Sequence, residues 1–145
     1  MEIIRISGEK DRFLDLLLIG DEQESMVRLY LERGDLFALS DQGEVRAVSV
    51  VTDEGGGVCE LKNIAVYPVY HGKGYGRALI EHVCNAYRGQ FQTLIVGTGE
   101  VPGAMRFYER CGFEPSHRVE NFFTDNYDHT MVEQGVTLKD IVYFK

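Results

Sequence analysis

A glycine-rich segment near the middle of the chain constrains the fold more than any other feature. It reads His71-Gly72-Lys73-Gly74-Tyr75-Gly76-Arg77-Ala78. An apolar and β-branched run, residues 58–67, precedes it. Apolar side chains at helical spacing follow it, namely Tyr75, Leu79, Val83, Ala86 and Tyr87. The chain must therefore pass from a strand through a glycine-rich turn into a helix that ends near Gly89.

This junction favours the binding of an anion. The first turn of a helix has backbone N–H groups without partners, and the helix dipole is positive there. Gly72, Gly74 and Gly76 lack the Cβ atoms that would keep a ligand away from the backbone. Lys73 and Arg77 add positive charge. The alternative is a turn that only starts a helix, and a short glycine motif alone does not separate the two.

Two familiar nucleotide-binding motifs fit this segment poorly. The glycine spacing is not G-x-G-x-x-G, and the next apolar run, residues 93–96, ends at Gly97 where a ribose-binding acid would be expected. Lys73 is not followed by Ser or Thr, and the spacing G-x-x-x-x-G-K is absent. The sequence therefore argues against a Rossmann dinucleotide site and against a P-loop.

The remaining periodicity predicts a single α/β domain over residues 1–145. Runs of β-branched and aromatic residues favour strands at 2–7, 36–39, 45–52, 58–67, 93–96, 116–123 and 136–144. Only turn residues separate the second, third and fourth runs, which predicts an antiparallel meander. The run at 93–96 is almost wholly apolar, which favours a strand buried on both faces and parallel to the strand before the helix.

Helices are predicted between these strands. Residues 13–17 have helical spacing, and Asp21 with Glu24 resembles a capping box for a second helix that ends at Gly34. A later short helix ends at Gly112 and carries one apolar stripe, made of Ala104, Phe107, Tyr108 and Cys111.

Charge and cysteine content narrow the classes of partner. The net charge of −8 argues against nucleic acid, because affinity for phosphates depends on clustered Lys and Arg. A cationic small molecule is a more natural ligand. Cys59, Cys84 and Cys111 are widely spaced and contain no C-x-x-C pair, so neither a disulfide framework nor a zinc site is predicted. We expect them to be small buried thiols.

No segment resembles a targeting or membrane-spanning sequence. Residues 1–6 lack the charged-then-apolar layout of a secretory signal, and the densest apolar run, residues 16–19, is too short to cross a bilayer. We therefore expect a cytoplasmic protein with no membrane partner. The sequence leaves both a monomer and a homodimer open.

Two blocks resemble the GNAT superfamily of acyl-CoA-dependent N-acetyltransferases. The first reads Glu60-Leu61-Lys62-Asn63-Ile64-Ala65-Val66-Tyr67-Pro68 and continues through His71-Gly72-Lys73-Gly74-Tyr75-Gly76. It is similar to the family's acyl-CoA motif, whose pattern is Gln/Arg-x-x-Gly-x-Gly/Ala. The second, Ala104-Met105-Arg106-Phe107-Tyr108-Glu109-Arg110-Cys111-Gly112-Phe113, resembles the family's later helix and its Gly-Phe exit. The sharp matches lie within residues 58–113, and the order of elements is similar over nearly the whole chain.

The resemblance implies a fold and a co-substrate. The fold is a three-layer α/β arrangement with a central, mostly antiparallel, splayed mixed β-sheet flanked by helices. In the family, strands that correspond to residues 58–66 and 93–96 diverge, and the pantetheine arm of acetyl-CoA inserts between them. No metal is implied. The residues expected to bind acetyl-CoA are Ile64, Ala65, Val66, His71, Gly72, Lys73, Gly74, Tyr75, Gly76, Arg77 and Tyr108.

The resemblance also implies catalytic roles. Glu60 stands where many members carry a catalytic glutamate, which would take the amine proton directly or through a water; the alternative is a strand carboxylate paired with Lys62. Tyr108 matches the family tyrosine that protonates the departing thiolate, and its alternative is a core tyrosine. The backbone N–H of Ala65 or Val66 would polarise the thioester carbonyl and stabilise the tetrahedral intermediate.

Two positions depart from the family pattern, and the acceptor pocket is the least defined part. His71 replaces the usual Gln or Arg, so it is either a phosphate donor or a loop residue, and Val101 stands where many members carry Asn. Acidic and aromatic residues are expected to attract and enclose a cationic amine, unless they form a solvated surface. They are Glu22, Glu24, Glu100, Asp125, Asp128, Glu133, Phe123, Tyr127 and Tyr30.

The resemblance therefore implies an N-acetyltransferase. It would transfer an acetyl group from acetyl-CoA to a primary amine of a small molecule or protein by direct attack. Two alternatives remain: a non-catalytic acyl-CoA sensor, or an interaction module on the same fold. The presence of both Glu60 and Tyr108 favours the enzyme.

Overall fold

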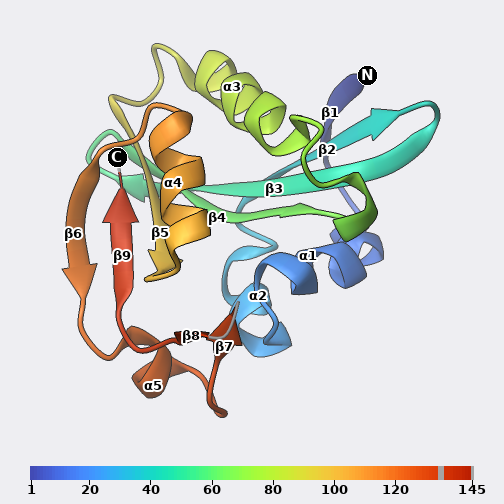
Figure 1. Ribbon diagram of the computed structural model, residues 1–145. Coiled ribbons are helices and arrows are strands. Elements are labelled where there is room, and N and C mark those ends of the chain that lie inside the picture. Colours follow the sequence, from blue (N-terminus) through green and yellow to red (C-terminus); the bar gives the residue numbers. More distant parts are fainter. Residues whose placement is uncertain (134–135, 145) are drawn as a thin grey trace. The chain divides into compact units, whose positions relative to one another are not determined.

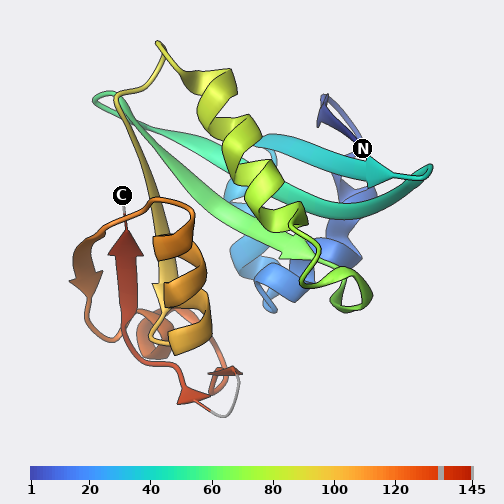
Figure 2. The ribbon, with the colours of Figure 1, turned by 45° about the horizontal axis from the view of Figure 1, so that its top comes forward.

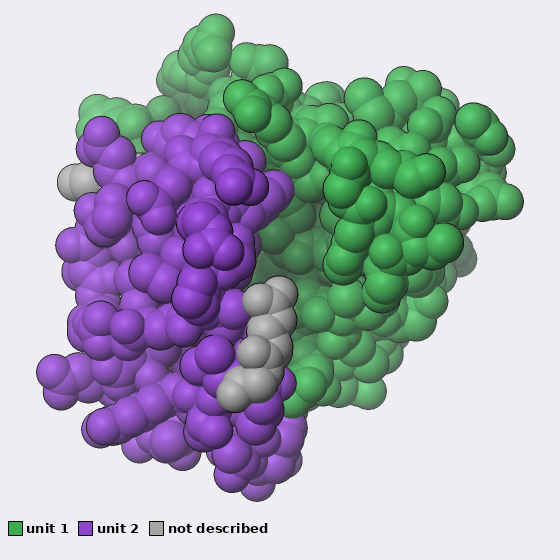
Figure 3. Space-filling model, viewed as in Figure 1, with its two compact units in different colours: residues 1–94 green, residues 95–145 purple. Residues whose placement is uncertain are grey.

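The computed structural model describes residues 1–133 and 136–144. The chain divides into two compact units, residues 1–94 and residues 95–145 (Figure 3). The expectation that residues 1–145 form one domain stays a prediction.

An antiparallel sheet forms the centre of the first unit (Figure 1). Its strands, in spatial order, are β1 (Glu2–Ile6), β2 (Asp35–Asp41), β3 (Glu44–Gly55) and β4 (Val58–Val66). In the turn between β2 and β3, Gln42 and Gly43 have positive φ angles of 54° and 80°. Left-handed residues in a two-residue turn match the twist of a hairpin. The predicted meander is therefore confirmed.

Helices cover both faces of this sheet (Figure 2). The 3₁₀ turn η1 (Lys10–Phe13) and the helices α1 (Leu14–Gly20) and α2 (Glu24–Tyr30) lie on one face. The helix α3 (Tyr75–Tyr87) crosses the other face, after the 3₁₀ turn η2 (Pro68–Tyr70). The core beneath α1 and α2 includes Leu16, Leu17, Val27, Leu31, Val48, Val50 and Ala65.

The helix after residue 20 starts later than the sequence predicts. Gln23 is the N-cap of α2, with extended φ and ψ of −108° and 115°, and no side chain caps the helix. Asp21 instead follows α1, and its N–H donates to Leu17 O at 3.0 Å. The capping box predicted for Asp21 and Glu24 is therefore wrong, because Asp21 belongs to the end of the preceding helix.

The second unit contains a smaller antiparallel sheet. Its strands, in spatial order, are β5 (Thr93–Gly99, which begins in the first unit), β9 (Ile141–Phe144) and β6 (Pro115–Val119). The helix α4 (Pro102–Arg110) ends before Gly112, whose φ of 100° confirms the predicted stop. The core of this unit contains Val101, Phe123, Met131, Leu138 and Ile141.

Three predicted features of this unit need correction. The strand predicted at 116–123 ends at Val119, because Asn121 is left-handed (φ 58°) and starts the short helix α5 (Phe122–Asn126). The strand predicted at 136–144 is two strands, β9 and β8 (Val136–Thr137), of which β8 pairs with β7 (Val132–Glu133). Only Val96 and Gly99 of β5 are buried, so the strand is not buried on both faces.

Within residues 1–133 and 136–144, no helix has the length and apolar character that crossing a membrane requires.

Candidate active site

The glycine-rich loop lies between η2 and the N-terminus of α3. Gly72 and Gly74 have φ angles of 77° and 85°, a left-handed conformation that glycine adopts without steric cost. A Cβ atom built on either glycine would meet no atom within 4 Å. Gly74 is also the N-cap of α3, and no side chain caps that helix. The loop therefore presents bare backbone to open space.

The amides of this loop are available to a ligand. Within the described part of the chain, no acceptor is recorded for the N–H groups of residues 72–77. The flanking amides are bonded, since His71 N–H donates to Pro68 O at 3.1 Å and Ala78 N–H donates to Gly74 O at 3.0 Å. Unpaired amides at the positive end of a helix, here one of 13 residues, are a common setting for anion binding in proteins. This donor set fits a diphosphate.

The charged side chains of the loop differ in their surroundings. Lys73 is exposed, and Arg77 forms an exposed ion pair with Glu81 at 3.2 Å, which solvent screens. His71 Nε2 lies 2.8 Å from Val66 O. Because a carbonyl oxygen only accepts, the ring must carry a proton on Nε2 in this contact. His71 thus ties the loop to the end of β4, which favours its interpretation as a loop residue.

Strand β4 contains a bulge at Lys62. On β3, Val50 pairs with Asn63 and Val51 pairs with Leu61, so Lys62 has no opposite partner. A bulge inserts one residue and thereby reverses the alternation of side chains between the two faces.

The bulge places Glu60 on the face of β4 that packs against α1 and α2. Val48, Val50 and Ala65 belong to the core cluster on that face. Thr52 follows Val50 by two residues on β3 and pairs with Glu60. Paired residues of an antiparallel sheet share a face. Without the bulge, Glu60 and Ala65 would lie on opposite faces, because their residue numbers differ by five, which is odd.

Glu60 is buried and also paired. Its exposed fraction is 7 %, and this burial raises the pKa of the carboxyl. Lys62 Nζ lies 3.2 Å from Glu60 Oε1 and acts in the opposite direction, since it favours the charged form. The net direction is upward. Glu60 therefore pairs with Lys62, as the interpretation as an ordinary strand carboxylate expects. Its pKa is also raised, as the interpretation as a general base requires.

Strand geometry distinguishes the two candidate backbone donors of β4. Tyr67 N–H donates to Arg46 O on β3 at 3.1 Å. Successive N–H groups along a strand point to opposite edges. The N–H of Ala65 therefore points towards β3, whereas the N–H of Val66 points away from β3. Val66 is the better candidate for polarising a carbonyl.

Tyr108 lies on α4 in the second unit and is 8 % exposed. Its ring packs against Phe113 and Phe144, with centroid separations of 5.8 and 6.2 Å. Burial, with a contribution from the negative charge of Glu133, raises the pKa of the phenol. Its hydroxyl makes no recorded hydrogen bond to any described residue. The phenol thus keeps its proton at neutral pH and has that proton free to donate.

Two of the acidic residues expected to attract an amine form surface ion pairs. Glu24 pairs with Arg28 at 3.2 Å, and Glu100 pairs with Arg118 at 2.7 Å. For these two carboxylates the structure favours the alternative of a solvated surface. The aromatic Phe123, also expected at the acceptor pocket, lies in the core of the second unit.

Tyr30, the remaining aromatic of that set in the first unit, belongs to a buried polar cluster. Its hydroxyl donates to Asp21 Oδ2 at 3.3 Å and accepts from Asn63 Nδ2 at 3.0 Å. Asn63 Nδ2 also donates to Leu17 O at 2.9 Å. The sequence alone does not identify Asn63, because an amide inside an apolar strand carries no motif.

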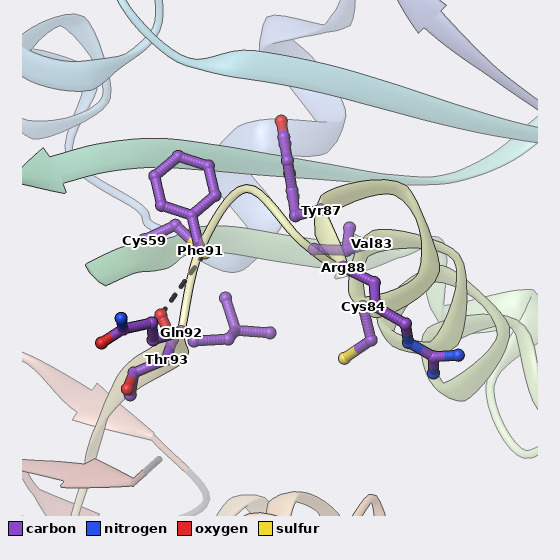
Figure 4. Close-up of a pocket in the computed structure, with 9 residues that line it drawn as sticks. Cys59, Val83, Cys84, Tyr87, Arg88, Phe91, Gln92 and Thr93 are labelled. Carbon is purple, nitrogen blue, oxygen red and sulfur yellow. Dashed lines mark hydrogen bonds between the residues drawn. The ribbon is translucent and has the colours of Figure 1, made fainter. Parts of the chain in front are cut away.

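A separate hollow of about 250 Å³ lies at the C-terminal end of α3 (Figure 4). It is lined by Cys59, Val83, Cys84, Tyr87, Arg88, Phe91, Gln92, Thr93 and Leu94. Cys59 Sγ lies 3.6 Å from Thr93 O, and burial raises the pKa of this thiol to about 11. The thiol is therefore protonated, and unreactive as a nucleophile, at neutral pH.

The cysteines differ from expectation in their exposure. Cys59 is buried, but Cys84 is exposed and Cys111 is partly exposed, so the expectation of buried thiols is correct only for the first. Across the described ranges, no group of three or more His, Cys, Asp or Glu side chains is arranged to hold a metal ion.

The sequence is similar to those of known proteins. A family model described as an acetyltransferase (GNAT) domain matches residues 32–115, a stretch that includes Glu60, the glycine-rich loop and Tyr108. A curated relative from Bacillus subtilis (strain 168), named uncharacterized N-acetyltransferase YvbK, is 31% identical over 147 residues. The alignment covers 98% of this chain and 95% of the relative.

Solved structures share the fold. A GNAT family acetyltransferase from Elizabethkingia anophelis with acetyl-CoA bound is 27% identical, with a TM-score of 0.93 over 99% of this chain and 95% of that one. A Bacillus subtilis acetyltransferase in complex with CoA is 29% identical, with a TM-score of 0.89 over 99% and 95%. The predicted α/β fold class, a mixed β-sheet flanked by helices, is confirmed.

Proposed function

The chain belongs to the GNAT family of acetyltransferases, and from this premise we propose that it transfers an acetyl group from acetyl-CoA to a primary amine. The unpartnered amides of residues 72–77 carry this proposal, because they match the diphosphate of coenzyme A in charge and in hydrogen-bonding capacity. The acceptor is an amine of a small molecule or a protein.

The glycine-rich loop and its two cationic side chains bind the diphosphate of acetyl-CoA. The open backbone at Gly72 and Gly74 lets phosphate oxygens approach the amides closely. Lys73 and Arg77 supply charge to the same anion. Bound acetyl-CoA supplies a thioester, which is an activated acyl donor. The N–H of Val66, which points away from β3, donates to the thioester carbonyl and stabilises the charge that develops on its oxygen.

Glu60 and Tyr108 move the two protons. An aliphatic amine has a solution pKa of about 10.4 and arrives protonated, so it must lose a proton to Glu60, directly or through a water. The amine adds to the thioester carbonyl, and the tetrahedral intermediate collapses as its C–S bond breaks. The sulfur leaves as a thiolate and takes the proton of the Tyr108 hydroxyl, and the second proton of the amine nitrogen then restores that hydroxyl, directly or through a water. No acyl-enzyme is required, since the amine attacks the thioester itself.

The charge of the protein favours a cationic acceptor. The net charge is −8, and the loop concentrates two of the fifteen Lys and Arg residues around the anion. An amine that arrives as a cation is attracted by the remaining acidic surface. We further propose that residues 1–145 act as one domain in the cytoplasm.

Two successive measurements test this function. Titration calorimetry with acetyl-CoA and with CoA should detect binding of both, because both carry the diphosphate. Thiol release should then be measured with a panel of diamines, amino sugars and peptides with free amino termini. Binding without thiol release for any amine would indicate a sensor. Absence of binding would refute the proposed function and favour an interaction module.

A further inference from the structure

Arg46 is a buried arginine on β3, with an exposed fraction of 9 %. Burying a guanidinium is unfavourable unless its charge and donors are satisfied. Arg46 Nε donates to Asp41 O at 3.2 Å, and Nη1 donates to the Tyr75 hydroxyl at 2.9 Å. That hydroxyl donates in turn to Asp41 Oδ2 at 2.8 Å. The cation is therefore held in a defined network.

The same guanidinium contacts two aromatic rings. Its central carbon lies 4.2 Å from the ring centre of Tyr70 and 5.7 Å from that of Tyr75. The two rings meet edge to face, 6.2 Å apart at an interplanar angle of 87°. The Tyr70 hydroxyl donates to Glu44 Oε2 at 2.9 Å, which fixes the far end of that ring. Cations over aromatic faces gain energy most when they are desolvated, as Arg46 is.

These contacts join the two ends of the glycine-rich loop. Tyr70 immediately precedes His71, and Tyr75 immediately follows Gly74 as the first residue of α3. We propose that Arg46 is a positioning residue for coenzyme A: by holding Tyr70 and Tyr75 together, it keeps the amides of the loop aimed at the diphosphate. This inference rests on the proposed function.

Arg46 acts through geometry rather than by touching the phosphates. Its Nε and Nη1 already donate to Asp41 O and to Tyr75, and the carboxylates of Asp41 and Glu44 accept hydrogen bonds from the two tyrosines that contact it. Glycines between the two tyrosines are free to adopt many conformations in the absence of a clamp. A loop ordered before binding loses less entropy when the ligand arrives. Arg46 therefore raises affinity by preorganising the loop.

The first test compares three arginine variants. In Arg46→Met we expect the dissociation constant for CoA to rise about tenfold or more. The KM for acetyl-CoA should rise in parallel, with kcat at saturation changed by no more than about twofold. Arg46→Lys keeps the charge but loses the planar fork, so it should restore only part of the affinity. Arg5→Met removes the same charge from an exposed pair with Asp35 and should bind CoA normally.

The second test locates the effect on the diphosphate. S-acetylpantetheine carries the thioester without phosphates, so Arg46→Met should leave its KM unchanged. Tyr70→Leu removes the ring that lies against Arg46 and should weaken CoA binding. Tyr70→Phe keeps the ring and loses only the hydrogen bond to Glu44, so it should weaken CoA binding less than Tyr70→Leu does. Thermal unfolding of each variant identifies those that fold. If Arg46→Met does not fold, the comparison of Tyr70→Leu with Tyr70→Phe tests the role of Arg46.

The outcomes separate this inference from the proposed function. If wild-type protein binds no CoA, the proposed function fails and the inference fails with it. If wild type binds CoA, wild-type affinity in Arg46→Lys, or in folded Arg46→Met or Tyr70→Leu, overturns the role of Arg46 and leaves the proposed function intact. The same holds if Arg46→Met raises the KM for S-acetylpantetheine as much as it raises the KM for acetyl-CoA.

Discussion

Glu60 and Asn63 face the same side of β4, although regular alternation would place them on opposite sides. The bulge at Lys62 causes this arrangement, and it directs the Glu60 carboxylate towards the face that α1 and α2 cover. A short bulge is a common means of re-aiming a side chain beside a functional site. The position of this one carboxylate makes its protonation state the first quantity to measure.

The substitution Glu60→Gln should lower kcat by about a hundredfold or more, because general-base catalysis contributes on that scale. The affinity for CoA should not change. The pKa of Glu60 is raised by burial, so the acid limb of the wild-type profile of kcat/KM against pH should lie above the ordinary carboxyl value of about 4.3. The variant should lose that limb. Glu32→Gln, at an exposed position, serves as the control.

The dependence of folding stability on pH provides an independent test of the raised pKa of Glu60. A carboxyl whose folded-state pKa is raised contributes stability below its unfolded pKa, and this contribution is lost as the pH rises through the folded pKa. At neutral pH the ionised Glu60 is therefore unfavourable. Chemical denaturation should show Glu60→Gln at least as stable as wild type at neutral pH; a clear loss would show that the Lys62 pair outweighs burial.

Lys62→Met tests the opposing influence on Glu60. Lys62 Nζ lies 3.2 Å from Glu60 Oε1 and lowers the pKa of that carboxyl. Its removal should raise the pKa further, so the acid limb of kcat/KM should move to higher pH. Lys139→Met removes a lysine from the second unit and should leave the limb in place. An unmoved limb in Lys62→Met would mean that a group other than Glu60 titrates in the profile.

The parts of the fold that depend on local pattern could be predicted from the sequence. The helix α3 follows from the spacing of Tyr75, Leu79 and Val83, and the β2–β3–β4 meander follows from turn residues between β-branched runs. The glycine-rich loop could also be placed, because glycines at a strand-to-helix junction have a local physical meaning.

Features that depend on long-range pairing could not be predicted. The bulge at Lys62 exists only in the register of β4 against β3. Arg46 looks like an ordinary strand residue until the fold brings Tyr70 and Tyr75 to it. Phe122 and Phe123 at the start of α5 favour a strand by propensity. The left-handed backbone of Asn121 and the packing of these rings in the core of the second unit override that preference.

Tyr108→Phe should lower kcat about tenfold to a hundredfold with little change in the affinity for CoA. The burial that raises the pKa of this phenol keeps it protonated through neutral pH, so Tyr108 should add no limb to the profile there. Because its hydroxyl has no recorded partner among the described residues, the variant should be as stable as wild type. Tyr67→Phe, which removes an exposed hydroxyl bond to Asp15, is the matched control. Full turnover in Tyr108→Phe would exclude the acid role.

Gly72→Ala separates backbone strain from ligand contact when it is compared with Gly43→Ala. The two glycines have nearly the same φ, 77° and 80°, and an added Cβ meets nothing within 4 Å at either. Each substitution should therefore lower the free energy of unfolding by about 1 kcal/mol. Only Gly72→Ala should weaken CoA binding, since its methyl group would enter the space assigned to the diphosphate. Equal affinity in both variants would contradict that assignment.

Gly20→Ala should destabilise the first unit through Asn63. A Cβ on Gly20 would lie 2.2 Å from Asn63 Oδ1 and 3.0 Å from Ile64 O. Asn63 cannot turn away without losing the hydrogen bonds from its Nδ2 to Leu17 O and to the Tyr30 hydroxyl. We expect a loss of about 2 kcal/mol or more in the free energy of unfolding.

Two further variants show whether that loss comes from the clash. Gly8→Ala, whose added Cβ meets nothing within 4 Å, should be close to neutral in chemical denaturation. The double variant Gly20→Ala/Asn63→Ala should lose less stability than the sum of the single variants, because removing the amide also removes the collision. Strictly additive losses would mean that the backbone around Gly20 moves and Asn63 does not. The contact between Gly20 and Asn63 would then not hold the α1–α2 connection against β4.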